Sequence, residues 1–414
     1  MLSVKNSVFN VNTDLINQLD FEKSRENLKP ILKKTNLIHS SIFSQESGNN
    51  IYIKPENLQV TGAFKIRGAY NKISKLSDEE KKRGLISSSA GNHAQGVAYA
   101  AEKLGVKATI VMPKTTPLIK VEATKNYGAE VVLHGDCYDE AYAEAVRLQN
   151  ENGYLFIHPF DDLDVIEGQG TIALEILEEL KTVDSIIVPI GGGGLISGIA
   201  VAAKSINPNI KIIGVEPEGA KSMKNSIEKG KLICLDDVCT IADGVAVKNP
   251  GNITFSIISD YVDEIVTVSD FDIMEAFLEL LQQHKLIGEN SGVLPLAALK
   301  KIKEKDKNIV CVVSGGNIDV VTISTMINQG LVSKGRIFCF SVNLPDKPGE
   351  LLKISQVLAD LNANVIQLDH NQFKAPDRFM QVQLEVTVET NGHKHVKQIV
   401  ETLKEIGYNV SKVY

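Results

Sequence analysis

The sequence predicts an α/β protein of two domains, and two observations carry this prediction. From about residue 51 to 320, short apolar runs rich in β-branched residues alternate with Ala-rich amphipathic segments, as in buried parallel strands joined by helices. A polar, glycine-flanked break follows at 328–336, and a different order of elements comes after it. A chain of 414 residues has room for two or three domains.

The first domain is expected at 1–330, with a smaller subdomain at roughly 57–155. Its clearest strands are the apolar runs ATIVM (108–112), EVVLH (130–134), SIIVPI (185–190), IKIIGVE (210–216) and NIVCVVS (308–314). Helical patterns separate these runs, so we expect buried parallel strands with helical crossovers.

The second domain is expected at 336–414 and consists of six elements. RIFCFSVNL is a strand pattern, GELLKISQVLADLN an amphipathic helix, ANVIQLDHNQF and RFMQVQLEVTVE two strands, HVKQIVETLKEIG a helix and YNVSKV a last strand. This β-α-β-β-α-β order is the ferredoxin-like arrangement, in which two helices cover one antiparallel sheet.

Composition argues against several classes of partner. Lys plus Arg (44) against Asp plus Glu (51) leaves a net charge of −7 without a long run of one sign, so no nucleic-acid partner is expected. The five cysteines are odd in number and scattered, which argues against a disulfide framework or a zinc motif and favours a reducing compartment. The first 15 residues carry no apolar signal-like run, and no later stretch has ~18 unbroken apolar residues. We therefore expect a cytoplasmic protein without a membrane partner.

Two polar segments mark a candidate site. In KPENLQVTGAFKIRGAYNKI, Lys65 stands at the entry to a helix. A dry ammonium there has a lowered pKa and can form a Schiff base, although a lysine beside a glycine is also typical of the solvated surface. In GLISSSAGNHAQG, Ser89 and Asn92 crowd the start of an Ala-rich helix, where they can bind a carboxylate or merely cap the helix. A structural, hydrogen-bonded role is the commoner one for a histidine such as His93.

Two further segments follow apolar strands. Gly191, Gly192, Gly193 and Gly194 lead from SIIVPI directly into a helix, so successive N–H groups can converge on one phosphate. The ending of a P-loop and the spacing of a dinucleotide-binding motif are absent, and a flexible linker is the remaining alternative. Ser314 follows NIVCVV at the carboxyl end of a strand, where parallel sheets bind ligands and where a serine can also be a cap.

Taken together, TGAFKIRGA, SSSAGNHAQG, PIGGGGL and SGGN resemble, in this order and spacing, the threonine dehydratases of fold type II of the pyridoxal-phosphate enzymes. The resemblance covers roughly residues 20 to 325 and implies the tryptophan synthase β-like fold, with pyridoxal 5′-phosphate as cofactor. It also implies a role for each motif residue. Lys65 holds the cofactor as a Schiff base, Asn92 binds its 3′ oxygen, Gly191 to Gly194 with Leu195 bind its phosphate, Ser314 meets its pyridine nitrogen, and Ser89, Asn92 and His93 surround the substrate carboxylate.

The reaction implied by this resemblance is β-elimination of water from L-threonine, giving 2-oxobutanoate and ammonia, with L-serine as a poorer substrate that gives pyruvate. A serine hydroxyl can donate to an unprotonated pyridine nitrogen, which disfavours a long-lived carbanion and suits prompt loss of a β-hydroxyl. Lys65 would take the α-proton, and the cofactor phosphate would protonate the departing hydroxyl.

Three alternatives remain. Serine racemases and serine dehydratases also resemble the chain, but racemases carry a serine before Gly-Asn-His as the base on the second face, and this position is Ala90 here. A sulfide-transferring synthase usually has threonine in place of His93. A catalytically silent amino-acid sensor is the third, and the intact Lys65 and glycine loop count against it.

Relatives bind a cation near a Val-Glu-Pro segment, represented here by Glu216, Ala220 and Ser222. Because Ser222 stands where divalent-binding relatives have an acidic side chain, we expect a monovalent cation such as potassium. A surface turn is the alternative.

The segment VNLPDKPGELLKISQVLADLNANVIQLDH resembles an ACT domain, which implies allosteric regulation by an amino acid. The turn from Asp346 to Gly349 leads into a helix, so its N–H groups can take an effector carboxylate while Asp346 or Asn364 meets the ammonium. ACT domains usually bind amino acids between paired copies, so a homodimer or homotetramer is expected, and a pairing domain without a ligand is the alternative. Isoleucine or valine is the expected effector, and the enzyme serves isoleucine biosynthesis or threonine breakdown.

Overall fold

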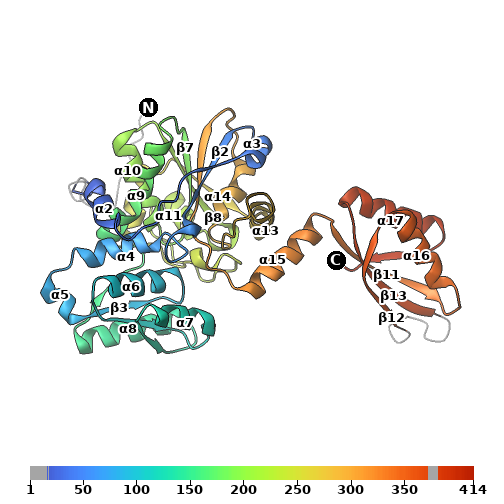
Figure 1. Ribbon diagram of the computed structural model, residues 1–414, viewed down its shortest axis with the longest axis horizontal. Coiled ribbons are helices and arrows are strands. Elements are labelled where there is room, and N and C mark those ends of the chain that lie inside the picture. The colour runs from blue at the N-terminus through green and yellow to red at the C-terminus, as the bar shows by residue number, and fades with distance from the viewer. Residues whose placement is uncertain (1–15, 17, 372–380) are drawn as a thin grey trace. The chain divides into compact units, whose positions relative to one another are not determined.

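The computed structural model describes residues 16, 18–371 and 381–414. The first 15 residues, part of the expectation about targeting, lie outside the described residues, as do 372–373 and 378–380 at the ends of two expected strands. The chain divides into two compact units, Met1–Ile318 and Asp319–Tyr414 (Figure 1). In the described part of the chain, no helix has both the length and the apolar character needed to cross a membrane.

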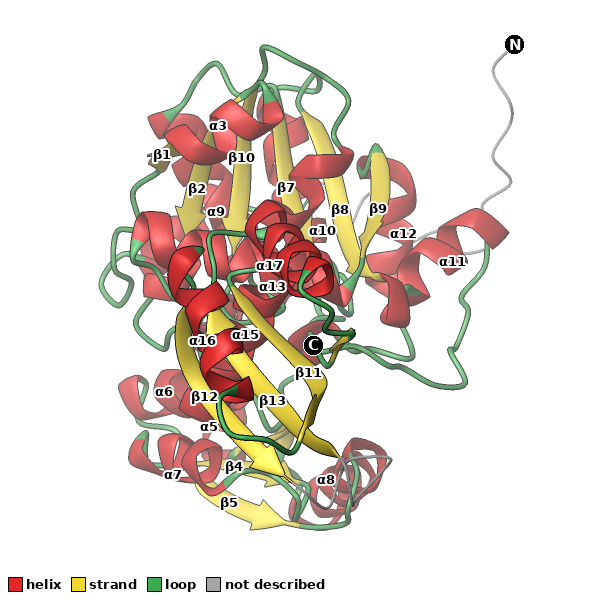
Figure 2. Cartoon of the chain, turned by 90° about the vertical axis from the view of Figure 1, so that its right-hand side faces the viewer, coloured by secondary structure: helices red, strands yellow, loops and turns green. Residues whose placement is uncertain are grey.

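The larger sheet of the first unit has six strands in the order β1-β2-β10-β7-β8-β9 (Figure 2). Their bounds are β1 Ile38–Ser40, β2 Asn50–Pro55, β10 Asn308–Val313, β7 Ser185–Pro189, β8 Lys211–Pro217 and β9 Glu264–Val268. Only β1 pairs antiparallel to its neighbour among these strands. The predicted runs at 185–190, 210–216 and 308–314 are confirmed as parallel strands, and they are buried because helices cover both faces of the sheet.

A second, all-parallel sheet has the order β5-β4-β3-β6, with bounds β5 Glu130–Leu133, β4 Ala108–Met112, β3 Leu85–Ser88 and β6 Leu155–Phe156. The predicted strands at 108–112 and 130–134 are confirmed. The expectation that EVVLH is buried on both faces is wrong, because β5 lies at the sheet edge and its first and last residues are exposed. Conversely, β3 is fully buried although its sequence LISS is half serine.

Helices surround both sheets. Their bounds are α2 Phe21–Leu28, α3 Ser41–Ser47, α4 Lys65–Ser74, α5 Asp78–Arg83, α6 Asn92–Lys103, α7 Leu118–Asn126, α8 Tyr138–Asn152, α9 Leu163–Glu179, α10 Gly194–Ile206, α11 Ser222–Lys229, α12 Asn252–Tyr261, α13 Asp270–Glu279 and α14 Leu294–Ala297. In Figure 1, α6, α7 and α8 gather around the second sheet in the lower part of the first unit.

Helix α9 packs between α4 and α10 with backbone-to-backbone contacts at glycines. A Cβ added to Gly168 would lie 2.5 Å from the carbonyl oxygen of Arg67, and one added to Gly198 would lie 2.2 Å from that of Ile166. Only glycine therefore permits these helix crossings. The crossings fix the first residues of α4 and α10, which are Lys65 and Gly194, relative to each other.

The second unit is an antiparallel sheet in the order β12-β13-β11-β14, with two helices packed on it. Its elements are α15 Val320–Ser333, β11 Ile337–Pro345, α16 Glu350–Asp360, β12 Asn364–Asn371, β13 Gln381–Glu389, α17 His393–Glu405 and β14 Val410–Lys412. The predicted β-α-β-β-α-β order is confirmed. Alternate residues of β11 and β13, such as Phe340 and Leu384, pack with Ile354 and Ile399 of the helices in one apolar core.

Candidate active site

Segments far apart in the sequence meet beyond the carboxyl end of β10. The N–H of Phe64 donates to the carbonyl oxygen of Ser314 (3.0 Å), and the N–H of Gly316 donates to that of Gly62 (2.9 Å). Ala63 and Gly315 form an antiparallel bridge between these hydrogen bonds. Ser314 is therefore held beside the first turn of α4, which begins with Lys65.

The ammonium of Lys65 lies among protein atoms. Its Nζ donates to the carbonyl oxygen of Pro159 (2.8 Å) and lies 5.2 Å from the ring centre of Phe64. Burial lowers the pKa of Lys65 to about 8, with the negative charge of Glu289 acting in the opposite direction. The residue as a whole is half-buried, so part of its surface stays accessible. It thus has the two properties that a Schiff-base lysine needs, an amine that loses its proton easily and access for a reactant.

Asn92, the first residue of α6, is held from two sides. Its Nδ2 donates to Oε1 of Glu289 (2.7 Å), and its Oδ1 accepts from Nδ2 of Asn317 (2.9 Å). Burial raises the pKa of Glu289 to about 7. Sequence analysis missed Glu289 and Asn317 as site residues. Glu289 stands in the non-periodic segment LIGENSG, and its acidic side chain between two glycines was the only signal available.

Ser89 and His93 flank Asn92 but differ in what they can donate. The hydroxyl oxygen of Ser89 accepts from the N–H of Gly91 (3.2 Å), so its own proton can point elsewhere. Nε2 of His93 lies 3.0 Å from the carbonyl oxygen of Ile157, which requires a proton on that nitrogen. Burial lowers the pKa of His93 to about 3, so the ring is neutral and Nδ1 has no proton to donate. Ser89 and Asn92 are therefore the better donors for a carboxylate.

The glycine loop forms the N-terminus of α10. In the described part of the chain, no acceptor takes a hydrogen bond from the amides of residues 191 to 195. Gly193 has φ 97°, and a Cβ on Gly192 would lie 2.3 Å from the ring of Phe160. Thr254 fixes the loop by donating from its hydroxyl to the carbonyl oxygen of Gly192 (2.6 Å). Free amides at the positive end of a helix dipole, in a loop that only glycine can form, fit a phosphate group.

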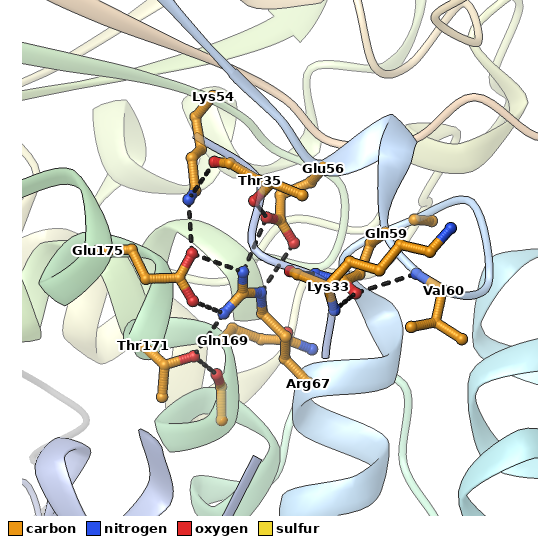
Figure 3. A network of polar contacts seen from close by, with 12 residues as sticks. Lys33, Thr35, Lys54, Glu56, Gln59, Val60, Arg67, Gln169, Thr171 and Glu175 are labelled. Atoms are coloured by element: carbon orange, nitrogen blue, oxygen red, sulfur yellow. Dashed lines mark hydrogen bonds and ion pairs between the residues drawn. The ribbon is translucent and has the colours of Figure 1, made fainter. Parts of the chain in front are cut away.

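A buried ion cluster around the side chain of Arg67 holds α4 where Gly168 of α9 crosses it (Figure 3). Arg67 donates from Nε and Nη2 to Glu56 (2.7 and 2.8 Å), and from Nη1 and Nη2 to Glu175 (2.6 and 2.9 Å). Nη1 also donates to the hydroxyl of Thr171 (3.1 Å), and Lys54 donates to Glu175 (2.5 Å). All five N–H groups of Arg67 are thus used, and the four charges sum to zero.

The residues named for a cation are engaged with the chain itself. The carboxylate of Glu216 accepts from the N–H groups of Met223 (2.9 Å) and Lys224 (2.8 Å) at the start of α11. The hydroxyl of Ser222 donates to the carbonyl oxygen of Val247 (2.8 Å), and Ala220 is buried. Burial raises the pKa of Glu216 to about 7. This geometry gives Glu216 a role as the cap of α11.

The structure does not bring the residues named for an effector together within one copy: Asp346 and Gly349 follow the last residue of β11, whereas Asn364 begins β12 at the opposite end of the second unit's sheet. Gly349 has φ 95° and immediately precedes α16, so the turn needs glycine there. Asp346 is exposed in the turn before it, and Asn364 is exposed at the start of β12.

Comparisons with known proteins agree with this architecture. The family model described as "Pyridoxal-phosphate dependent enzyme" matches residues 28–315, and the ACT domain model matches 340–408. The L-threonine ammonia-lyase of Thermotoga maritima is 48% identical over 394 residues, which are 94% of this chain and 98% of that protein.

Two solved structures are also similar. The processed form of threonine deaminase isoform 2 from Solanum lycopersicum is 39% identical, with a TM-score of 0.74 over 80% of this chain and 93% of that one. Maize serine racemase is 37% identical, with a TM-score of 0.71 over 75% of this chain and 97% of that one. The chain therefore belongs to the pyridoxal-phosphate-dependent enzymes of fold type II, in the threonine ammonia-lyase family of carbon–nitrogen lyases, and carries a C-terminal ACT domain.

Proposed function

We propose that the enzyme deaminates L-threonine by eliminating water, giving 2-oxobutanoate and ammonia. The observation that carries the proposal is the meeting of Lys65, with its pKa lowered to about 8, and Ser314 at the carboxyl end of β10. The unpaired amides of the glycine loop and the match to an L-threonine ammonia-lyase over 94% of the chain support it.

Each of these residues has a task in the proposed reaction. When bound, pyridoxal phosphate supplies an electron sink that weakens the α C–H bond of an attached amino acid. Lys65 anchors the cofactor, and its Nζ takes the α-proton, which a pKa near neutrality allows. The hydroxyl of Ser314 serves as a neutral donor to the ring nitrogen, and the amides of residues 191 to 195 hold the phosphate. Ser89 and Asn92, at the start of α6, orient the substrate carboxylate.

Serine racemization is the second candidate function, because the maize serine racemase has a closely similar fold. Ala90 argues against it, since a methyl group offers no acid or base on the second face of the substrate. The test is to incubate the enzyme with L-serine and to quantify both pyruvate and D-serine. The proposal expects slow pyruvate formation without D-serine, and D-serine as the main product would favour the racemase.

Regulation and assembly complete the proposal. An amino acid such as isoleucine or valine binds near Asp346, Gly349 and Asn364, between ACT domains of two copies, in a homodimer or homotetramer. A cytoplasmic role in isoleucine biosynthesis fits such an effector.

A monovalent cation near Glu216, Ala220 and Ser222 remains a prediction, and measuring turnover at increasing potassium concentration tests it.

A further inference from the structure

A chain of hydrogen bonds with one possible direction passes through the active site. It begins at the carbonyl oxygen of Thr61, which can only accept, and which lies 2.7 Å from Nδ2 of Asn317. The same Nδ2 donates to Oδ1 of Asn92, and Nδ2 of Asn92 donates to Glu289. Because the Thr61 carbonyl can only accept, Asn317 must present Nδ2 to it and to Asn92, so Asn92 presents Oδ1 to Asn317 and Nδ2 to Glu289.

This orientation decides what Asn92 offers to a ligand. One hydrogen of its Nδ2 is directed to Glu289, and no acceptor in the described part of the chain takes the other. If the amide turned over, its oxygen would occupy that place and would repel an anionic ligand oxygen. The contacts with Asn317 and Glu289 therefore together keep a donor, rather than an acceptor, on that side of Asn92.

The backbone around Glu289 is built to bring its carboxylate to Asn92. The N–H of Glu289 donates to the carbonyl oxygen of Gly315 (2.9 Å), which joins its loop to the segment after Ser314. A Cβ on Gly315 would lie 2.4 Å from Oε1 of Glu289 and 3.1 Å from Nδ2 of Asn92. Only glycine at 315 leaves room for the contact.

Three charged groups face Glu289 from other elements. Lys65 of α4 and Lys120 of α7 are cationic, and Asp243 is anionic. Among the described residues, Asn92 donates a hydrogen bond to the Glu289 side chain, whereas these charges act on it through space.

We propose that Glu289 is a positioning residue that, together with Asn317, holds the amide of Asn92 so that a free N–H faces the 3′ oxygen of the cofactor. The inference rests on the proposed role of Asn92 as a cofactor ligand. In this proposal, Glu289 acts as a hydrogen-bond acceptor for Asn92, and the negative charge of its carboxylate matters less than the position of the acceptor oxygen.

The test compares two variants of the full-length enzyme. Glu289→Gln keeps an acceptor oxygen within reach of Asn92, whereas Glu289→Leu removes it at similar size. Loss of this buried hydrogen bond should raise the cofactor dissociation constant about tenfold in Glu289→Leu and move the cofactor absorbance from the visible toward the near-ultraviolet band. Glu289→Gln should restore the band and hold the dissociation constant within about threefold of wild type.

Asp243→Asn is the matched control, because it removes a negative charge that acts on Glu289, whereas the side-chain hydrogen bonds of Asn92 among the described residues are with Glu289 and Asn317. It should leave the absorbance unchanged. The proposal is overturned if folded Glu289→Leu binds cofactor with wild-type affinity and absorbance, or if Glu289→Gln behaves like Glu289→Leu. Should Glu289→Leu fail to fold, Asn317→Ala breaks the chain at its other end and must move the absorbance in the same direction.

These readouts also separate this inference from the proposed function. Absorbance and cofactor affinity are measured without substrate, so the predicted differences can appear in an enzyme that does not deaminate threonine. In that case the assigned reaction fails and the role of Glu289 stands.

Discussion

The environment of Lys65 determines when its amine is reactive. Protein atoms displace water from the ammonium and lower its pKa from 10.5 to about 8, even though Glu289 favours the charged form. A neutral amine is required to attack an aldehyde, and its fraction rises with pH until the pKa is passed. The lowered pKa of Lys65 therefore depends on the surrounding side chains keeping water away from its amine.

We predict that the rate of cofactor capture by the apoenzyme rises with pH and levels off above about pH 8. Stopped-flow absorbance after mixing apoenzyme with pyridoxal phosphate measures this rate. A lysine with the ordinary pKa of 10.5 would instead give a rate that keeps rising to pH 10 and beyond. That second profile would contradict the desolvation of Lys65.

Site residues that carry a motif were predictable, and those that act through long-range contacts were not. Lys65, Asn92 and Ser314 each stand at the end of a recognisable strand or at the start of a helix. Glu289 and Asn317 belong to the site because they contact Asn92 from positions about 200 residues away in the chain. Asn317 ends the SGGN motif and Glu289 stands between two glycines, but neither local pattern indicates that their side chains contact Asn92.

At the scale of elements, the helices α4, α9 and α10 form the frame of the site. Glycine crossings set how closely they pack, and the Arg67 cluster joins α4 to α9 and to the segment after β2 (Figure 3). Burying four charges is costly unless each is fully paired, and here the pairing is complete for Arg67. The cluster therefore favours one packing of α4 over alternatives.

We predict that Arg67→Lys lowers the free energy of unfolding by about 2 to 3 kcal/mol, because an ammonium cannot replace the five-donor fork between two carboxylates. Urea unfolding of the enzyme at fixed cofactor concentration measures it. Arg147→Lys is the control, since Arg147 pairs with Glu144 and Glu151 on the exposed surface of α8 and its change should be too small to detect. Equal losses in both variants would refute the special role of the cluster.

Elements were predicted well where burial gives a strong pattern. The strands β4, β7, β8 and β10 are mostly apolar and were found from the sequence. The strand β3 was not, because its two serines are satisfied or enclosed by the fold, as when the hydroxyl of Ser87 donates to the carbonyl oxygen of Ile157 (2.9 Å). Such a contact crosses 70 residues and leaves no local signal.

At the scale of the whole molecule, the candidate active site and the ACT domain occupy separate units. The division falls between Ile318 and Asp319, so α15 belongs to the second unit, ahead of the composition break at 328–336 from which the boundary was placed. The break was visible because it is polar and rich in glycine. The apolar start of α15, with Val320 and Val321, resembles the helices before it and hides the earlier division.

We predict that a chain ending at Ile318 still deaminates L-threonine but no longer responds to isoleucine or valine, because the residues named for the effector are in the second unit. Initial rates with increasing effector, for the full chain and the shortened one, measure this. Asp346→Ala in the full chain should weaken the response while leaving the rate without effector unchanged. A shortened chain that keeps the full response would place the effector site in the first unit.

The most direct test of the account is turnover of L-threonine by the purified enzyme with added pyridoxal phosphate, followed as 2-oxobutanoate, for wild type, Lys65→Ala and the control Lys204→Ala, whose lysine pairs with Asp263 outside the candidate site. We predict that wild type and Lys204→Ala form 2-oxobutanoate at similar rates, that L-serine gives pyruvate more slowly, and that Lys65→Ala forms neither product. If wild type binds the cofactor but forms no 2-oxo acid from either amino acid, or if Lys65→Ala retains wild-type turnover, the central claim is wrong.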